Sequence, residues 1–394
     1  MRLHPMIYAA VLAGIGAIAF LNAGQAKAVT FTPTQLTNNS FNDVLPQISG
    51  SNVVWQSEQS INSAEIFFYD GKATTQLTNN SYEDAFPQIS GSNVVWHGGL
   101  SPSSFEIFLY DGKTTTQLSS NSFNNMFPQI SGPNVVWQGL DGHDHEIFLY
   151  DGKTTTQLTN NSYRDLLPKI SGSNIVWLGF LDEYSPTQIF FHDGTITTQL
   201  TNSRFEKSSP QISGSNVVWS SSDGHDDEIF LFDGKTITQL TNNDRNDSNP
   251  QVSGSNVVWE GSTPNSYEIF LFDGKTTTQL TNNNITDSEA EISGSNVVWR
   301  SYDGNNHSKI FFYDGTTISQ VSDKSLFNYY PKISGSNVIW ESYDDNDVEI
   351  VLATPTSATV SEPASILGLL ALGAFGVGSA LKSKQKQRST RHGR

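Results

Sequence analysis

Loops rich in aspartate and histidine are the parts of this 394-residue chain best suited to binding chemistry. Clustered carboxylate and amide oxygens at alternate positions are the hard ligands that Ca²⁺ prefers. The same Asp-Gly and Asn-rich strings also form tight turns for backbone reasons, and the spacing is not that of an EF-hand. Two interpretations therefore stay open, a calcium site or a set of solvated turns. The loops contain Asp141, His143, Asp144 and His145; Asp223, His225, Asp226 and Asp227; Asp303; and Asp344, Asp345 and Asp347.

The histidines of these loops can be compared with the ligands of a zinc site. Zn²⁺ is held by three or four converging ligands, often Cys or His. His143 and His145 stand one residue apart, and His225 is equivalent to the first of them in another loop. The chain has no cysteine, so thiolate ligands, cysteine nucleophiles and disulfides are all excluded. Because loops of separate repeats need not meet, the histidine pattern does not predict a metal site.

One pair of residues departs from its repeats in a way that acid–base catalysis could use. Glu291 and Lys332 stand where most repeats have glutamine, in segments expected to line a central channel. The alternative is an internal ion pair or a solvated channel wall, and perturbed charges occur in both settings. No Ser-His-Asp or paired-carboxylate arrangement stands apart from the repeats. We therefore predict no catalytic residue.

The elements that carry these residues are revealed by the tryptophans. All eight close the phrase Ser-Gly-Ser-Asn-Val-Val-Trp or a close variant, at intervals of about 40 residues, which is the signature of blades or solenoids. A residue present in every unit serves the packing common to every unit more often than it binds a ligand, and Trp buries a large area. An aromatic platform for sugars is the less favoured alternative. The tryptophans are Trp55, Trp96, Trp137, Trp177, Trp219, Trp259, Trp299 and Trp340.

Each repeat reads as four short strands separated by Gly, Asn and Asp turns. The last repeat lacks its fourth strand, whereas residues 32–37 supply an orphan copy of that strand at the start. A closed ring resolves both facts and removes two exposed sheet edges. The sequence thus predicts an all-β, eight-bladed β-propeller of four-stranded antiparallel blades, closed by the N-terminal strand. The expected blades are 46–78, 87–119, 128–159, 168–201, 210–241, 250–281, 290–322, and 331–352 with 32–37.

The repeat also resembles a known family. The pattern Pro-x-x-Ser-Gly-Ser-Asn-x-x-Trp, followed by Glu-Ile-Phe-x-Tyr-Asp-Gly and Gln-Leu-Thr, resembles TolB-type (WD40-like) β-propeller repeats across residues 29–354. Ser-Gly-Ser-Asn replaces the usual Ser-Pro-Asp-Gly turn, and eight repeats replace the six common in TolB. The resemblance implies a propeller that binds proteins or other ligands.

Binding residues are expected on one face of the predicted disc. Turns of an antiparallel meander alternate between its two ends. The Ser-Gly-Ser-Asn and Asp-Gly-Lys turns share one end and barely vary, whereas the second-to-third and blade-to-blade loops share the other end and vary strongly. Loops on a rigid scaffold are where binding residues concentrate. The variable face therefore adds Arg164, Arg245, Tyr329 and Tyr330 to the Asp- and His-containing loops.

Both ends of the chain indicate export. Residues 1–28 form a basic start, an apolar stretch and Ala26-Lys27-Ala28, which predict a signal peptide cleaved near Ala26 and Ala28. Residues 355–365 form a linker with Ser361-Glu362-Pro363, followed by apolar residues 366–381 and a basic tail, 382–394. This arrangement resembles a PEP-CTERM sorting signal, which implies a Gram-negative bacterium, transient membrane anchoring and processing by an exosortase-type enzyme. An ordinary membrane anchor is the alternative.

The charge of the chain limits its partners. The formal net charge is −17, and eight of the 22 basic residues lie in the two ends. Such an acidic middle repels nucleic acid and anionic lipid, and it favours cations or basic partners. We therefore expect an exported, non-enzymatic scaffold that binds a protein or polysaccharide of the cell envelope or extracellular matrix, without a required cofactor. The alternative is a glycan-acting lyase or hydrolase with a site in the channel.

Overall fold

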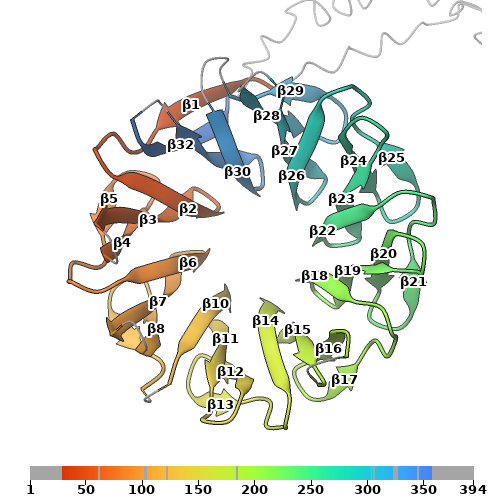
Figure 1. The fold of residues 1–394 in the computed structure, drawn as a ribbon. Helices are drawn as coiled ribbons and strands as arrows, with labels where there is room; N and C mark the ends of the chain where they lie inside the picture. Colours follow the sequence, from red (N-terminus) through yellow and green to blue (C-terminus); the bar gives the residue numbers. More distant parts are fainter. Residues whose placement is uncertain are drawn as a thin grey trace, which may run out of the picture.

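The computed structural model describes residues 29–356, apart from 61–62, 102–103, 121–122, 183–184, 303, 305–306, 323–326 and 344–345. The described residues form eight four-stranded antiparallel sheets arranged as a ring, which confirms the predicted eight-bladed propeller (Figure 1). None of the described residues belongs to a helix that could cross a membrane. The predicted signal peptide and sorting segment lie outside the described residues.

The innermost strand of each blade borders the central channel (Figure 1). These strands begin three or four residues before the predicted starts, because a β-bulge lets pairing continue past the proline that seven of the eight strands contain. In blades 1 to 8 they are β2 (Asn42–Ser49), β6 (Asp84–Ser90), β10 (Asn125–Ser131), β14 (Arg164–Ser171), β18 (Lys207–Ser213), β22 (Asp247–Ser253), β26 (Thr286–Ser293) and β30 (Phe327–Ser334).

The second and third strands form the middle of each blade. The second strands are β3 (Asn52–Ser60), β7 (Asn93–Ser101), β11 (Asn134–Leu140), β15 (Asn174–Phe180), β19 (Asn216–Ser222), β23 (Asn256–Ser262), β27 (Asn296–Tyr302) and β31 (Asn337–Tyr343). The third strands are β4 (Ser63–Tyr69), β8 (Ser104–Tyr110), β12 (His145–Tyr150), β16 (Gln188–His192), β20 (Asp227–Phe232), β24 (Tyr267–Phe272), β28 (Ser308–Tyr313) and β32 (Val348–Pro355).

The outer strands are short, exposed and rich in threonine. In blades 1 to 7 they are β5 (Thr74–Gln76), β9 (Thr115–Gln117), β13 (Thr155–Gln157), β17 (Thr197–Gln199), β21 (Ile237–Gln239), β25 (Thr277–Gln279) and β29 (Ile318–Gln320). Blade 8 takes its outer strand from the other end of the sequence: β1 (Phe31–Gln35) pairs antiparallel with β32, so that Phe31 faces Pro355 and Gln35 faces Val351. This closure confirms the prediction.

The hydrophobic core lies between blades, where each sheet packs on the next. One such cluster joins Val54, Ile66 and Phe68 of blade 1 to Val94 and Trp96 of blade 2. All eight tryptophans are at most 2 % exposed. The tryptophans therefore stabilise the ring, as predicted, because burying a side chain of this size removes a large apolar area from water.

A belt of hydrogen bonds explains the constant Ser-Gly-Ser-Asn phrase. In every blade the glycine N–H donates to the serine that ends the preceding blade's innermost strand, as Gly91 does to Ser49 Oγ at 2.8 Å. The asparagine Nδ2 of every blade donates to the glycine carbonyl of the following blade, as Asn52 does to Gly91 at 2.9 Å. We call these contacts the serine–asparagine belt. The belt runs around the face that carries the Ser-Gly-Ser-Asn and Asp-Gly-Lys turns, which we call the constant face. It includes the contact between blades 8 and 1.

Candidate ligand-binding site at the channel mouth

One residue in each innermost strand has a left-handed backbone. Its φ lies between 49° and 57°, although no residue of the set is glycine. Such a conformation costs roughly 1–2 kcal/mol for an L-residue, and it concentrates at functional sites. We call this set the mouth ring, because its members stand at the bulge near the variable end of the channel strands. The members are Leu45, Phe86, Phe127, Leu167, Ser209, Asn249, Glu289 and Tyr330.

The preceding blade holds the backbone of these mouth-ring residues in place through hydrogen bonds. Leu45 N donates to Glu341 Oε1 at 2.7 Å, and Glu289 N donates to Glu260 Oε1 at 2.7 Å. The acceptor is in each case the residue that follows the tryptophan of the preceding blade. Phe86 N makes the same bond to Gln56 Oε1 at 3.1 Å. The strained backbone is thus fixed by a polar side chain of the adjoining blade, and the side chain of the mouth ring is left to vary.

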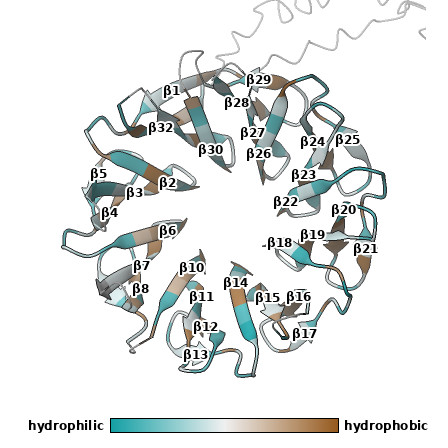
Figure 2. Cartoon of the chain, viewed as in Figure 1, coloured by the Kyte–Doolittle hydropathy of each residue, from teal (hydrophilic) through white to brown (hydrophobic). Residues whose placement is uncertain are grey.

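Side chains of the mouth ring divide into an apolar arc and a polar arc. Blades 8, 1, 2, 3 and 4 contribute Tyr330, Leu45, Phe86, Phe127 and Leu167, whereas blades 5, 6 and 7 contribute Ser209, Asn249 and Glu289. Hydrophobic, brown segments are visible on β2 and β14, two of the strands that carry the apolar arc (Figure 2). A ligand could contact several of these side chains, because Phe86 is 41 % exposed, Leu167 47 % and Tyr330 55 %.

A cavity of ≈ 300 Å³ opens beside the apolar arc, lined by all five of its members. Phe86 and Phe127 meet edge to face, with ring centroids 5.1 Å apart, and His97 packs against both rings. Burial lowers the pKa of His97 to about 4, so this imidazole is neutral at physiological pH. The cavity wall in this sector is therefore aromatic and uncharged.

Polar side chains line the channel below the mouth ring. A further cavity of ≈ 270 Å³ is bordered by five glutamines together with Lys169, Glu291 and Lys332. Lys332 Nζ forms an ion pair with Glu291, as in the internal ion pair that the sequence analysis gave as the alternative to catalysis. Lys169 Nζ donates to Gln129 Oε1 at 3.4 Å, and burial together with Lys332 lowers the pKa of Lys169.

Blades 7 and 8 form the charged sector of the mouth. Arg300 pairs with Glu289, whose other oxygen accepts from Tyr330 N at 2.7 Å. The Arg300 guanidinium also lies 4.9 Å from the centre of the Tyr329 ring. Burial raises the pKa of nearby Glu341 to about 7. Two tyrosines predicted from the sequence, Tyr329 and Tyr330, are thus placed at the mouth.

The other predicted residues lie farther out, on separate blades. Arg164 is exposed at the start of β14 and lies over Phe180, with Cζ 5.1 Å from the ring centre. Exposed residues include His143, His225 and Asp227, whereas His145, Asp141, Asp144, Asp223, Asp226 and Asp347 are half-buried. Asp303, Asp344 and Asp345 lie outside the described residues. These residues do not gather at one point, because blade 4 separates the Asp-rich loops of blades 3 and 5.

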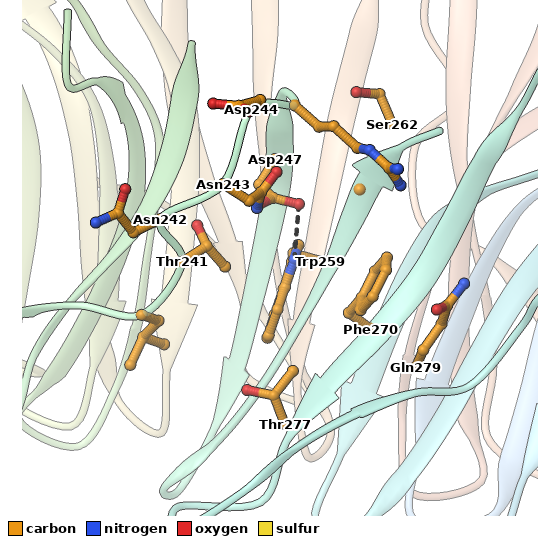
Figure 3. A pocket seen from close by; sticks show the side chains of 13 residues that line it. Thr241, Asn242, Asn243, Asp244, Asp247, Trp259, Ser262, Phe270, Thr277 and Gln279 are labelled. Carbon is orange, nitrogen blue, oxygen red and sulfur yellow. Dashed lines mark hydrogen bonds between the residues drawn. The ribbon is translucent and has the colours of Figure 1, made fainter. Parts of the chain in front are cut away.

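Arg245 lines a hollow of ≈ 800 Å³ on blade 6. Trp259 and Asp247 stand in its wall, and the indole Nε1 donates to Asp247 Oδ1 at 3.1 Å (Figure 3). Trp259 is only 1 % exposed, so the hollow does not present an indole face to a ligand. The comparable bond from Trp96 to Asp84 is 2.9 Å, which marks this contact as part of the shared blade core.

Most of the mouth ring was not predicted from the sequence. A left-handed backbone before proline has no signature of its own, and seven of the eight members precede proline. The signal in the sequence was the variation at this one position of the repeat. It is occupied by Leu, Phe, Ser, Asn, Glu or Tyr, whereas the positions that follow it are nearly constant. Among this ring only Tyr330 was proposed for binding.

No protein-family profile matches the chain, and no curated protein matches it in sequence. Solved structures match in fold. The β-propeller domain of the Trilobed protease from Pyrococcus furiosus, described as having an open velcro topology, aligns with a TM-score of 0.53 and 13 % identity, over 72 % of this chain and 99 % of that one. In contrast, β1 closes the ring here.

Two further structures show the same fold. The computationally designed Ika8 protein aligns with a TM-score of 0.54 and 14 % identity, over 80 % of this chain and 98 % of that one. A prolyl endopeptidase aligns with a TM-score of 0.55 and 9 % identity, over 78 % of this chain but only 55 % of that one. At these identities the likeness shows a β-propeller and nothing about activity.

Proposed function

We propose that this protein is an exported, non-enzymatic propeller scaffold that binds a protein or polysaccharide of the bacterial envelope or extracellular matrix. Its binding site is the variable face, centred on the mouth ring. The observation that carries this proposal is the divergence of eight strained positions inside an otherwise repetitive ring. Phe86, Leu167 and Tyr330 are large, apolar and exposed, although their backbone angle favours glycine or asparagine.

The chemistry of the mouth favours a protein loop as the ligand. The cavity beside the apolar arc has the volume of one or two side chains, and its aromatic rings meet edge to face rather than offering one flat surface. Lys169, which also lines this cavity, has no ion-pair partner among the described residues, and a bound acidic group would favour its charged form. An apolar side chain beside an acidic group on a projecting loop satisfies both features, and a polysaccharide is the other outcome of the test.

Two sequence resemblances complete the proposal. The TolB-type repeat pattern supports a ligand-binding propeller, and the arrangement around Ser361-Glu362-Pro363 supports sorting to the cell surface by an exosortase-type enzyme. Release from the membrane would place the variable face in contact with the envelope or matrix. Detection of a shortened C-terminus in the mature protein by mass spectrometry would support the sorting step.

A pulldown with the full-length protein tests binding directly. We expect the wild type to retain an envelope protein or a glycan, and the double variant F86N/Y330N to retain neither. The matched control is E268Q, a buried position on the outer part of blade 6. If no partner is retained under any condition, the binding proposal fails. Turnover of a glycan that disappears in K169Q or E291Q would instead establish the lyase or hydrolase alternative.

A further inference from the structure

The loops of blades 3 and 5 bring three carboxylates together in the same way. In blade 3, one carboxylate oxygen from each of Asp141, Asp144 and Glu146 lies within 4.8 Å of the other two. Blade 5 repeats this arrangement with Asp223, Asp226 and Glu228. We call these sets the acidic trios. They are the two such groups among the described residues, and they contain no histidine.

The backbone of both loops is built alike. Asp141 N donates to Asp144 O at 3.1 Å, and Asp223 N donates to Asp226 O at 3.1 Å. Each turn passes through a glycine with strongly positive φ, 105° at Gly142 and 114° at the equivalent position of blade 5. The turn directs both aspartates toward the glutamate near the start of the third strand. One loop geometry therefore creates both trios.

Several oxygens of the trios are buried without a hydrogen-bond partner. Glu228 is fully buried and its Oε2 accepts no hydrogen bond, and the same is true of the buried atom Asp226 Oδ1. Asp144 Oδ1 is equally buried and unpartnered in blade 3. A carboxylate oxygen withdrawn from water without a donor is unfavourable, and two of them side by side also repel each other. A bound cation would remove both costs.

The buried glutamate alone does not create this situation. Glu65 of blade 1 and Glu268 of blade 6 also have a buried, unpartnered Oε2, yet no aspartate accompanies them in a trio. Only blades 3 and 5 add two aspartates to that glutamate among the described residues. The glutamate is therefore a common feature of the fold, and the aspartates convert it into a ligand set. Glu65 and Glu268 supply natural controls.

We propose that the acidic trios of blades 3 and 5 each bind a Ca²⁺ ion. Ca²⁺ binds hard oxygen ligands at about 2.3–2.6 Å, so ligand atoms on its shell lie up to roughly 5 Å apart, which accommodates the 4.8 Å spacing. Three carboxylates on one side leave the remaining positions to water and to a ligand's own oxygens. Blade 5 is the better site, because in blade 3 the Thr159 hydroxyl already donates to Glu146 Oε2.

These sites extend beyond the proposed partner binding and do not depend on it. Both loops lie on the variable face, so bound calcium would stiffen two of its loops and change its charge locally. The loop sequences did not suggest the ligand glutamates Glu146 and Glu228, because the same Glu-Ile-Phe segment occurs in five of the eight blades.

Calorimetric titration of the chelator-treated full-length protein with CaCl₂ tests the proposal. We expect saturable binding, a stoichiometry that falls by one in D226N/E228Q and by one in D144N/E146Q, and no change in the control E268Q. Stoichiometries unaltered by either double substitution would overturn the assignment, as would the absence of binding at millimolar CaCl₂. Equally tight binding of MgCl₂ would overturn the choice of Ca²⁺.

Thermal unfolding provides a second readout that guards against misfolded variants. With chelator present, D226N/E228Q should be as stable as the wild type or more stable, because like charges have been removed from a buried site. With CaCl₂ present, the wild type should gain more in Tm than this variant does. A variant less stable than the wild type with chelator, and equally responsive to CaCl₂, would contradict the proposal.

Discussion

The two faces of the propeller differ in what their loops contribute. On the constant face, the serine–asparagine belt repeats the same two hydrogen bonds between all neighbouring blades, and its residues hardly change. On the variable face, the mouth ring repeats one strained backbone angle while its side chains change from blade to blade. The side chains of the belt are thus the same in every blade because they make the contacts between blades. Constancy of backbone with divergence of side chain is the observation on which we base the proposed binding surface.

The shared core beneath both faces should show the largest effect. Replacing Trp259 with alanine leaves a cavity between blades and removes the bond to Asp247, because the indole is 1 % exposed and Nε1 donates to that carboxylate. Large-to-small changes of this kind cost about 3–5 kcal/mol. Chemical denaturation should therefore show a midpoint far below that of the wild type. A loss under about 1 kcal/mol would contradict the packing role.

Acidic groups buried between the faces should make stability depend on pH. Burial raises the pKa of Glu341 to about 7 and that of Asp84 to about 6, above their ordinary values of 4.5 and 3.8. At pH values between these raised pKa values and the ordinary ones the folded protein holds protons that the unfolded chain releases, so these two carboxyls should make stability rise as pH falls from 8 to about 6.5, by about 1–3 kcal/mol. Below about 6.5 buried His97, whose pKa is lowered to about 4, acts in the opposite direction, because only the unfolded chain protonates it.

The variant E341Q isolates one of these groups. Its amide oxygen can still accept from Leu45 N but cannot ionise, so this variant should exceed the wild type in stability at pH 8 and match it near pH 4.5. Denaturation midpoints measured across this range would decide the matter. Parallel curves for the two proteins would show that Glu341 does not titrate as described.

Breaking the belt should have a smaller effect, confined to stability. The double variant N256A/N296A removes two inter-blade bonds of 2.8 Å on the constant face. Each bond contributes about 0.5–1.5 kcal/mol, so the loss should be about 1–3 kcal/mol. Partner binding below the melting temperature should be unchanged. A variant that keeps its stability but loses its partner would reverse the roles assigned to the two faces.

The fold followed from the sequence because its signals are repeated eight times. The tryptophan spacing counted the blades, and the missing fourth strand of the last repeat matched the orphan segment that became β1. The boundaries of the innermost strands were set too late, at Pro46 rather than Asn42 in blade 1. A proline usually interrupts pairing, and nothing local showed that the bulge at Leu45 restores it.

The acidic trios and the mouth ring could be predicted only in part from the sequence. Asp141, Asp144, Asp223 and Asp226 were identified by type, but Glu146 and Glu228 complete the trios through burial that the sequence does not display. The mouth ring depends on a backbone angle set by the neighbouring blade, as the bond from Leu45 N to Glu341 shows. Contacts between blades are long-range, so local propensity carries no trace of them.

The smallest effect on stability belongs to the mouth ring itself. In F86N/Y330N, asparagine tolerates the left-handed backbone better than phenylalanine or tyrosine, which offsets the loss of side chains that are 41 % and 55 % exposed. Stability should therefore change by less than about 1 kcal/mol in either direction. A larger loss, seen in thermal unfolding, would mean that these side chains serve packing.

The most direct test of the account measures partner retention and Tm together for F86N/Y330N and the wild type. We predict that the variant keeps the wild-type Tm to within a few degrees and loses the partner that the wild type retains. Wild-type retention by this variant, at equal Tm, would contradict the claim that the divergent mouth ring is the binding site.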